Sequence, residues 1–165
     1  GYWKDVGTVA SLWQSNMDLL YSDNLNLGDE SWPILSKSAL MSPHFIGGNA
    51  RISNSFITEG CYVDGEVRHS IVFDGVTVEK GAVVLDSVVL SGATIRSGAR
   101  VVKTIVGENV VIGKNAKLGE GGSTRFVSHY CTEGVSLVGA NVTVEDNAEY
   151  APDSMVVEEG GEDND

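Results

Sequence analysis

The sequence predicts an all-β solenoid, a parallel β-helix of hexapeptide repeats, because the chain repeats itself at two periods. A hydroxyl residue followed by two aliphatic residues recurs every 17 positions, at Ser70-Ile71-Val72, Ser87-Val88-Val89 and Thr104-Ile105-Val106. Within this period an aliphatic residue returns at every sixth position, as in Ile112-Gly113-Lys114-Asn115-Ala116-Lys117-Leu118. A fixed period of this kind is typical of solenoids whose coils stack on one another.

Each coil is expected to have three flat faces, with one short strand on each, and three corners. Three faces of about six residues give a coil of about 17 or 18 residues. Gly or Asn recurs at the corners, since these residues adopt positive φ most readily, and the recurring aliphatic residue points inward. The sequence has no Pro between residues 44 and 151, as expected where each strand donates its amides to a neighbouring coil. By resemblance to known hexapeptide solenoids we expect a left-handed coil, an exception to the right-handed crossover rule.

Residues 1–22 predict a short helix ahead of the coils. Thr8 is a suitable N-cap, because its hydroxyl can accept a hydrogen bond from an amide of the first turn. Apolar residues then follow at helical spacing and form one stripe: Val9, Leu12, Trp13, Met17 and Leu20. This stripe must be covered, either by a domain that precedes the chain or by the side of the solenoid.

A connector and the coils follow the helix. Residues 23–45 contain Pro33 and Pro43 and predict an irregular connector. The solenoid is expected over residues 46–151. The chain begins without Met in what reads as the middle of a motif, so we expect a fragment of a longer protein.

Two interruptions are predicted toward the end of the chain. The period breaks at residues 119–134, which we expect to leave the solenoid as a loop. Its glycines at 119–122 are followed by no helical pattern, so they do not favour a phosphate-binding loop. Residues 152–165 are expected to form an acidic tail, disordered toward its end. Because a solenoid end needs covering, the helix or the loop is expected to cap one.

Composition excludes several classes of function. The 165 residues suit one domain of ordinary size, and the net charge of −12 argues against a nucleic-acid partner. No run of 18 apolar residues and no signal peptide is visible, so we expect a cytoplasmic protein without a membrane span.

The two cysteines do not form a disulfide framework. Cys61 occupies the column of Val76, Ala93 and Val110, an inward position, so it is predicted to be a buried free thiol. Cys131 lies in the irregular stretch, and its role stays open. A reducing compartment is the default for such a chain.

Several segments carry a resemblance to a known enzyme family. They are Gly1-Tyr2-Trp3-Lys4-Asp5-Val6-Gly7-Thr8, Leu12-Trp13, Asn16-Met17-Asp18-Leu19, Ser31-Trp32-Pro33-Ile34, Ser55-Phe56-Ile57-Thr58-Glu59-Gly60-Cys61, Gly65-Glu66-Val67 and His69-Ser70-Ile71-Val72-Phe73-Asp74-Gly75-Val76. Together they resemble bacterial glucose-1-phosphate adenylyltransferase (ADP-glucose pyrophosphorylase), from the end of its catalytic domain into its β-helix. The resemblance covers most of residues 1–118 and is weaker beyond them.

This resemblance implies a nucleotidyltransferase reaction in the complete enzyme. ATP and glucose 1-phosphate would give ADP-glucose and pyrophosphate for glycogen synthesis, with Mg²⁺ screening the phosphate charge. The Asp of the Trp-x-Asp segment is a metal ligand in such enzymes, and Asp5 matches it. The alternative is that Asp5 only hydrogen-bonds the start of the helix. The remaining active-site groups have no matching positions, so we expect this chain alone to be inert and to bind no Mg²⁺.

The resemblance also implies roles in assembly and regulation. The β-helix of the family docks on the missing N-terminal catalytic domain and joins subunits into a homotetramer, sometimes with a non-catalytic companion subunit. Effectors bind near the junction of the two domains, where His44 lies, although a surface side chain is the simpler reading of His44. Aliphatic residues on the flat faces, such as Val72, Val89 and Val106, favour self-association along one face, so we expect an oligomer.

Two other functions occur on the same fold. Hexapeptide acyltransferases place a catalytic His near a coil corner, where His69 lies, and His129 lies in the loop. A metal-dependent hydratase would need about three His around Zn²⁺, and this sequence shows no paired spacing among its three. A lone His at a corner is more often structural, and fold alone does not fix function.

Overall fold

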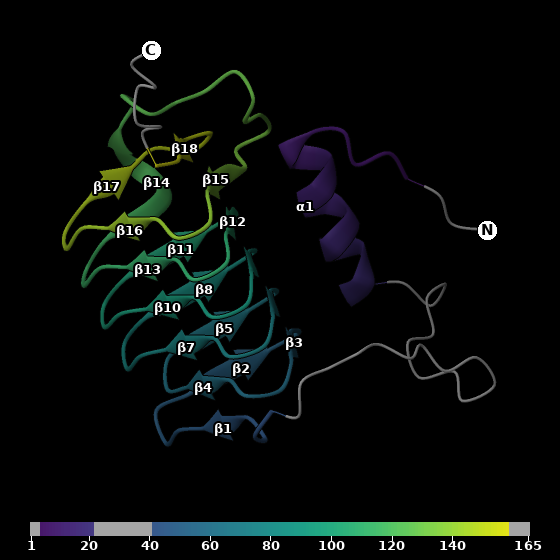
Figure 1. Cartoon of the computed structure of the whole chain (residues 1–165), viewed down its shortest axis with the longest axis vertical. Coiled ribbons are helices and arrows are strands. Elements are labelled where there is room, and N and C mark those ends of the chain that lie inside the picture. The colour runs from purple at the N-terminus through teal and green to yellow at the C-terminus, as the bar shows by residue number, and fades with distance from the viewer. Residues whose placement is uncertain (1–3, 22–40, 159–165) are drawn as a thin grey trace, which may run out of the picture.

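A computed structural model describes residues 4–21 and 41–158 of the chain as a stack of coils with one helix beside it (Figure 1). Within these residues the coils run through three parallel sheets of six strands each, here called sheets A, B and C. Neighbours in each sheet are strands from successive coils, as the pairings Tyr62↔Thr77 and Val72↔Val89 illustrate. The predicted parallel β-solenoid is confirmed, and its left-handed sense stays a prediction.

The strands are short and follow one another around the coil in the order A, B, C. Sheet A holds β1 (Phe45–Ile46), β4 (Tyr62–Val63), β7 (Thr77–Val78), β10 (Thr94–Ile95), β13 (Val111–Ile112) and β16 (Thr143–Val144). Sheet B holds β2 (Arg51–Ser53), β5 (Glu66–Arg68), β8 (Val83–Leu85), β11 (Arg100–Val102), β14 (Lys117–Ser123) and β17 (Glu149–Tyr150). Sheet C holds β3 (Phe56–Ile57), β6 (Ile71–Val72), β9 (Val88–Val89), β12 (Thr104–Val106), β15 (Ser136–Val138) and β18 (Met155–Val156).

The core runs along the solenoid axis as columns of small aliphatic side chains. On sheet C the register places Val72, Val89 and Val106 one above the other, and all three are fully buried. Sheets A and B contribute equivalent columns to the same cluster. Burying a Val side chain stabilises a fold by about 1.5–3 kcal/mol, so this repetition is the main source of stability.

The outer face of sheet C differs from the expectation. The three valines expected to form an outer apolar face point inward. Val72, Val89 and Val106 are fully buried, so their side chains cannot contact a partner. Successive side chains of a strand point to opposite faces, so the residues before them, Ile71, Val88 and Ile105, form the outer column. These are at most 4% exposed, and Val88 and Ile105 are buried in a cluster with residues of the N-terminal helix. The three valines therefore give no support for self-association along this face.

Two of the three corners turn on Gly or Asn, as predicted. The corner between sheets C and A has positive φ at Gly75, Gly92, Asn109 and Asn141. The corner between sheets A and B has positive φ at Gly81, Gly98, Asn115 and Asn147. These residues adopt the left-handed region at little cost.

A column of buried hydroxyls explains the repeated Ser or Thr. Ser87 Oγ donates to the carbonyl of Leu85 at 2.7 Å and accepts the amide of Thr104, one coil on, at 3.2 Å. Ser70 Oγ accepts the amide of Ser87 in the same way, at 3.1 Å. Each hydroxyl thus accepts a buried amide of the next coil and donates to a carbonyl of its own coil, which at Leu85 also accepts the amide of Lys103.

The predicted helix is α1 (Val9–Met17), continued by a short 3₁₀ turn over Asp18–Leu20. Thr8 is its N-cap, and Thr8 and Ser11 exchange side-chain to backbone hydrogen bonds in a capping box. Leu12 was predicted to lie on the covered stripe but is 41% exposed, whereas Ala10 is buried against sheet C. Sheet C covers the stripe, and the small residue Ala10 lies where the helix packs closely against it.

The loop excursion begins later than predicted. Strand β14 continues to Ser123, and both Leu118 and Ser123 pair with Tyr150, so the strand bulges between them. Positive φ at Gly119, Gly121 and Gly122 accommodates this bulge, which the sequence shows only as a break in the period. The glycine-rich stretch is therefore strand, with no helix after it.

The loop that follows lies across the C-terminal end of the stack, at the top of Figure 1. Val127 forms an antiparallel bridge to Ser154, and the carbonyl of Phe126 accepts the amide of Met155 at 2.8 Å. The ring of Phe126 meets Tyr150 edge-on at 5.1 Å. Because β18 lies at residues 155–156, the solenoid extends past the predicted boundary at 151 into the segment expected to be tail.

Some predictions fall on residues that the structure does not describe. These are residues 1–3, most of the connector at 22–40, and the end of the tail at 159–165. Within the described ranges, no helix is long and apolar enough to cross a membrane.

Candidate functional site

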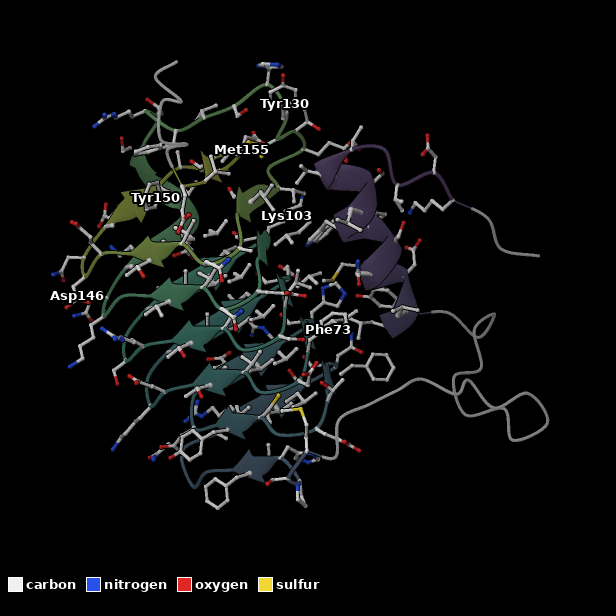
Figure 2. The ribbon with its side chains drawn as sticks, in the orientation of Figure 1. Phe73, Lys103, Tyr130, Asp146, Tyr150 and Met155 are labelled. Carbon is white, nitrogen blue, oxygen red and sulfur yellow. The ribbon has the colours of Figure 1, made fainter. Side chains whose placement is uncertain are left out.

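The most distinctive site in the described part of the chain is the contact between α1 and sheet C. Buried residues from both sides form a second apolar cluster, separate from the axial core. On the solenoid side it consists of Val88, Ile105 and Val135, flanked by Phe73, Leu90 and Leu137. Ala10 and Met17 face them from α1, with Val9, Trp13 and Leu20 partly buried beside them. Figure 2 shows Phe73 and Lys103 on the side of the solenoid that faces α1.

One edge of this contact is the corner between sheets B and C, here called the B–C corner. His69, Asp86 and Lys103 stand one coil apart there, with φ of 47°, 48° and 46°. The left-handed conformation costs a non-glycine residue about 1–2 kcal/mol. Asn54 and Asp153 also have positive φ at this corner, so it contains no Gly at these five positions. Asn, Asp and His are the non-glycine residues enriched in this conformation, so Lys103 is the least expected residue at this corner.

Trp13 binds to two residues of the B–C corner. Its indole Nε1 donates a hydrogen bond of 2.7 Å to the carbonyl oxygen of Asp86. Lys103 Nζ lies 5.1 Å from the centre of the Trp13 ring, within the range of a cation–π contact. The same ammonium donates to the carbonyl of Glu133 at 2.6 Å, which ties the loop to this corner. Trp13 is therefore held at its edge and on its ring face.

His69 and Asp86 form a pair within the corner. Their Nδ1 and Oδ1 atoms are 2.6 Å apart, and since a carboxylate can only accept, Nδ1 carries the proton. The His69 ring also meets the Tyr21 ring at 5.1 Å, at the end of the 3₁₀ turn. Its Nε2 is buried and has no hydrogen-bond partner within the described residues. The pair holds the imidazole in one orientation against the helical segment.

The segment that precedes α1 is tied to the helix itself. Asp5 Oδ1 accepts the amide of Gly7 at 3.0 Å, two residues before the helix starts at Val9. Lys4 Nζ pairs with Asp18 Oδ2 at 2.9 Å, which joins the segment to the other end of α1. Asp5 is exposed. Both predicted roles of Asp5 stay compatible with this geometry, because one accepted amide leaves further lone pairs on the carboxylate.

The structure does not bring the other predicted site residues together. His44 is exposed near the first strand, and His129 is exposed in the loop, where its ring lies 3.9 Å from that of Tyr130. In residues 4–21 and 41–158, no three His, Cys, Asp or Glu side chains gather closely enough to hold a metal ion.

Both cysteines are buried free thiols. Cys61 is 2% exposed, as predicted from its column, and its thiol donates to the carbonyl of Phe73 at 3.0 Å. Cys131 is 3% exposed. Burial raises the pKa of both thiols, so neither has the character of a nucleophile.

Sequence reasoning missed most of the B–C corner. It singled out His69 alone and left Asp86, Lys103 and Tyr21 without a role. A signal was present, because the position before each Ser or Thr of the period holds His69, Asp86 and Lys103 in turn. At the other corners the equivalent columns read Gly or Asn, so charged residues in a turn column indicate a contact outside the coil.

The hexapeptide architecture agrees with a known family. The sequence pattern described as "GlmU-like, C-terminal hexapeptide" matches residues 38–138. The chain belongs to this family. The match spans the first coils through β15 and leaves α1 outside.

Curated relatives are more specific about the parent enzyme. Glucose-1-phosphate adenylyltransferase of Clostridium beijerinckii is 53% identical over 129 residues, which cover 78% of this chain and 33% of that enzyme. The enzyme of the same name from Bacillus cereus (strain Q1) is 53% identical over 87 residues, or 52% of this chain and 23% of the enzyme. That of Clostridium botulinum (strain Eklund 17B / Type B) is 54% identical over 87 residues, with 52% and 22% covered.

The chain therefore spans about a quarter to a third of the length of these relatives. The matching part is the C-terminal part of each enzyme. The resemblance to glucose-1-phosphate adenylyltransferases is confirmed.

Proposed function

We propose that this chain is the C-terminal β-helix domain of a glucose-1-phosphate adenylyltransferase, with residues 1–22 as the end of its catalytic domain. The observation that carries the proposal is the 53% identity to the Clostridium beijerinckii enzyme over 78% of the chain. The packing of α1 on sheet C supports it, because a solenoid that positions a neighbouring domain needs such a contact.

The parent protein would form ADP-glucose and pyrophosphate from ATP and glucose 1-phosphate, for glycogen synthesis in the cytoplasm. Mg²⁺, when bound, would screen the charge of the transferred phosphates. Asp5 would be one of its ligands, since an exposed carboxylate suits a hard cation. A single carboxylate without a phosphate site holds Mg²⁺ weakly, so the chain alone is expected to bind none and to be inert.

Within the parent, this domain would serve assembly and regulation. It would hold the catalytic domain through α1 and join subunits into a homotetramer, with or without a companion subunit. His44, exposed near the first strand, would lie close to the junction where anionic effectors bind. Light scattering on the chain tests self-association directly: a mass that is a multiple of 17.5 kDa supports it, and a monomer at high concentration contradicts it.

Acyl transfer is the second candidate, and one observation favours it. The 2.6 Å contact between His69 and Asp86 resembles the orientation of a general base by a carboxylate. However, Nε2 of His69, the atom that would take the proton, is buried. Turnover of acetyl-coenzyme A by the chain would establish this function, and its absence is expected.

The experiment that tests the proposal is an assay of ADP-glucose formation. The parent protein and this chain are each incubated with ATP, glucose 1-phosphate and Mg²⁺, and ADP-glucose is measured by chromatography. Activity in the parent and none in the chain supports a separated regulatory and assembly domain. A parent that forms no ADP-glucose contradicts the proposed activity and points instead to a companion subunit.

A further inference from the structure

The B–C corner differs from the other two corners in the residues that adopt its left-handed turns. The other two corners use Gly or Asn for the same left-handed conformation. Of the residues at the B–C corner, His69, Asp86 and Lys103 occupy three successive coils. Figure 2 shows Lys103 on the side of the solenoid that faces α1. The side chains of Lys103 and His69 contact Trp13 and Tyr21, and Asp86 accepts the indole N–H of Trp13 through its backbone carbonyl.

We infer that His69, Asp86 and Lys103 are positioning residues, which hold α1 and the segment before it in one register on the solenoid. The apolar contact of α1 with sheet C is non-directional and would allow the helix to slide or rotate. The hydrogen bond from Trp13 to Asp86 and the ring contacts of Lys103 and His69 are directional. They select one position out of those that the apolar face permits.

The position of α1 on the solenoid also determines the position of the residues that precede the helix. Thr8 and Ser11 fix the chain at the N-terminus of α1, and Lys4 pairs with Asp18 at its far end. The segment from Lys4 to Thr8, which includes Asp5, therefore moves with α1 as one unit. A shift of α1 along the corner would shift the Asp5 carboxylate by a similar distance.

The consequence for catalysis rests on the proposed function. If Asp5 is a metal ligand in the parent enzyme, the B–C corner sets where that ligand stands relative to the substrate phosphates. Small displacements of positioning groups reduce rates strongly even when the displaced group lies far from the chemistry. The solenoid would then influence the reaction rate through α1 without touching the substrates.

The first test uses this chain alone. Lys103→Asn and His69→Asn keep a residue that tolerates positive φ but remove the contacts with Trp13 and Tyr21. Amide hydrogen exchange, read by mass spectrometry, should become about tenfold or more faster over residues 9–17 and stay unchanged in the strands of sheet A. Asn147→Gly is the matched control, because Asn147 has φ of 61° at a corner remote from α1. Unchanged exchange over residues 9–17 in both Asn variants would overturn the inference.

The second test uses the parent enzyme. Lys103→Asn should lower kcat several-fold and raise the Mg²⁺ concentration needed for half-maximal rate, while Lys103→Arg, which keeps a cation over Trp13, should restore both. Wild-type rates in Lys103→Asn, combined with faster exchange in α1, would overturn the catalytic consequence of the inference. A wild-type parent without any ADP-glucose synthesis would instead refute the proposed function, and the exchange experiment would still decide whether the corner positions α1.

Discussion

The indole Nε1 of Trp13 donates a 2.7 Å hydrogen bond to the carbonyl oxygen of Asp86, which lies 73 residues later in the chain. This bond joins the only α-helix of the described residues to a corner of the solenoid. Asp86 adopts positive φ at that corner, and its side chain holds His69. Asp86 therefore connects its corner to the helix through its backbone carbonyl and to the neighbouring coil through its side chain.

Replacing Trp13 by Phe should lower the free energy of unfolding by about 1–3 kcal/mol. Phe keeps an aromatic ring in the apolar cluster but removes the donor and leaves the carbonyl of Asp86 without its partner. Urea unfolding followed by circular dichroism measures the change. Leu12→Ala is the control on the same helix, since Leu12 is exposed, and it should change stability by less than about 0.5 kcal/mol. Equal effects of the two substitutions would contradict the docking of Trp13 at this corner.

Replacing Ser87 by Ala should be more damaging than its small change of volume suggests. The substitution leaves the amide of Thr104 and the carbonyl of Leu85 without the Ser87 hydroxyl in a fully buried column. An unsatisfied buried group costs about 1–3 kcal/mol. Ser87→Thr should recover most of the loss, because Thr104 fills the same position in the next coil. A thermal unfolding midpoint for Ser87→Ala that equals the wild-type value would contradict this role.

Acidification should weaken the ion pair between Arg100 and Glu120. Arg100 Nε and one of its terminal nitrogens lie 2.7 and 2.8 Å from the two carboxylate oxygens, and this hydrogen bonding lowers the pKa of Glu120. Because the folded-state pKa is lowered, the stabilisation is present above the ordinary pKa of Glu and is lost as the pH falls through the folded-state pKa. Both side chains are about one-third exposed, so the effect should be below about 1 kcal/mol.

The matched variant for this pair is Glu120→Gln. Its stability, measured by urea unfolding from pH 7 down to pH 3, should fall less steeply than that of the wild type. The difference between the two curves should shrink as the pH falls and Glu120 takes up its proton. Parallel curves over the whole range would show that the pair contributes nothing.

The native protein should react slowly with thiol reagents. Cys61 and Cys131 are buried, and burial raises the pKa of both thiols, so little thiolate is present or accessible at pH 8. Ellman's reagent should modify both thiols rapidly in guanidinium chloride and neither within minutes under native conditions. Rapid reaction of one thiol in the native state would contradict its placement.

The sequence predicted the coils well because their signal repeats. Each inward column repeats a buried aliphatic residue at a fixed spacing, as at Val72, Val89 and Val106. The period therefore predicts the register in which the strands pair. The C-terminal end of the solenoid departs from the repeat and was misplaced. Strand β14 runs through glycines that a sequence reading takes for a loop, and β18 lies within an acidic stretch.

The contact between helix and corner was only half predictable. The apolar stripe required a cover, but the exposure of Leu12 and the burial of Ala10 depend on how α1 lies on sheet C. Asp86 is a common turn residue and Lys103 is not, but neither residue carries a local signal for its contact with Trp13. Their function depends on a partner far away in the chain, which local patterns do not contain.

The behaviour of the Trp13 indole proton in solution tests the contact between α1 and the B–C corner most directly. In ¹⁵N-labelled chain, its signal is identified as the indole resonance that disappears in Trp13→Phe. We expect this proton to exchange slowly with solvent and to show nuclear Overhauser contacts to the side chain of Lys103. An indole proton that exchanges rapidly and shows no contact with the solenoid would contradict the contact between α1 and the B–C corner.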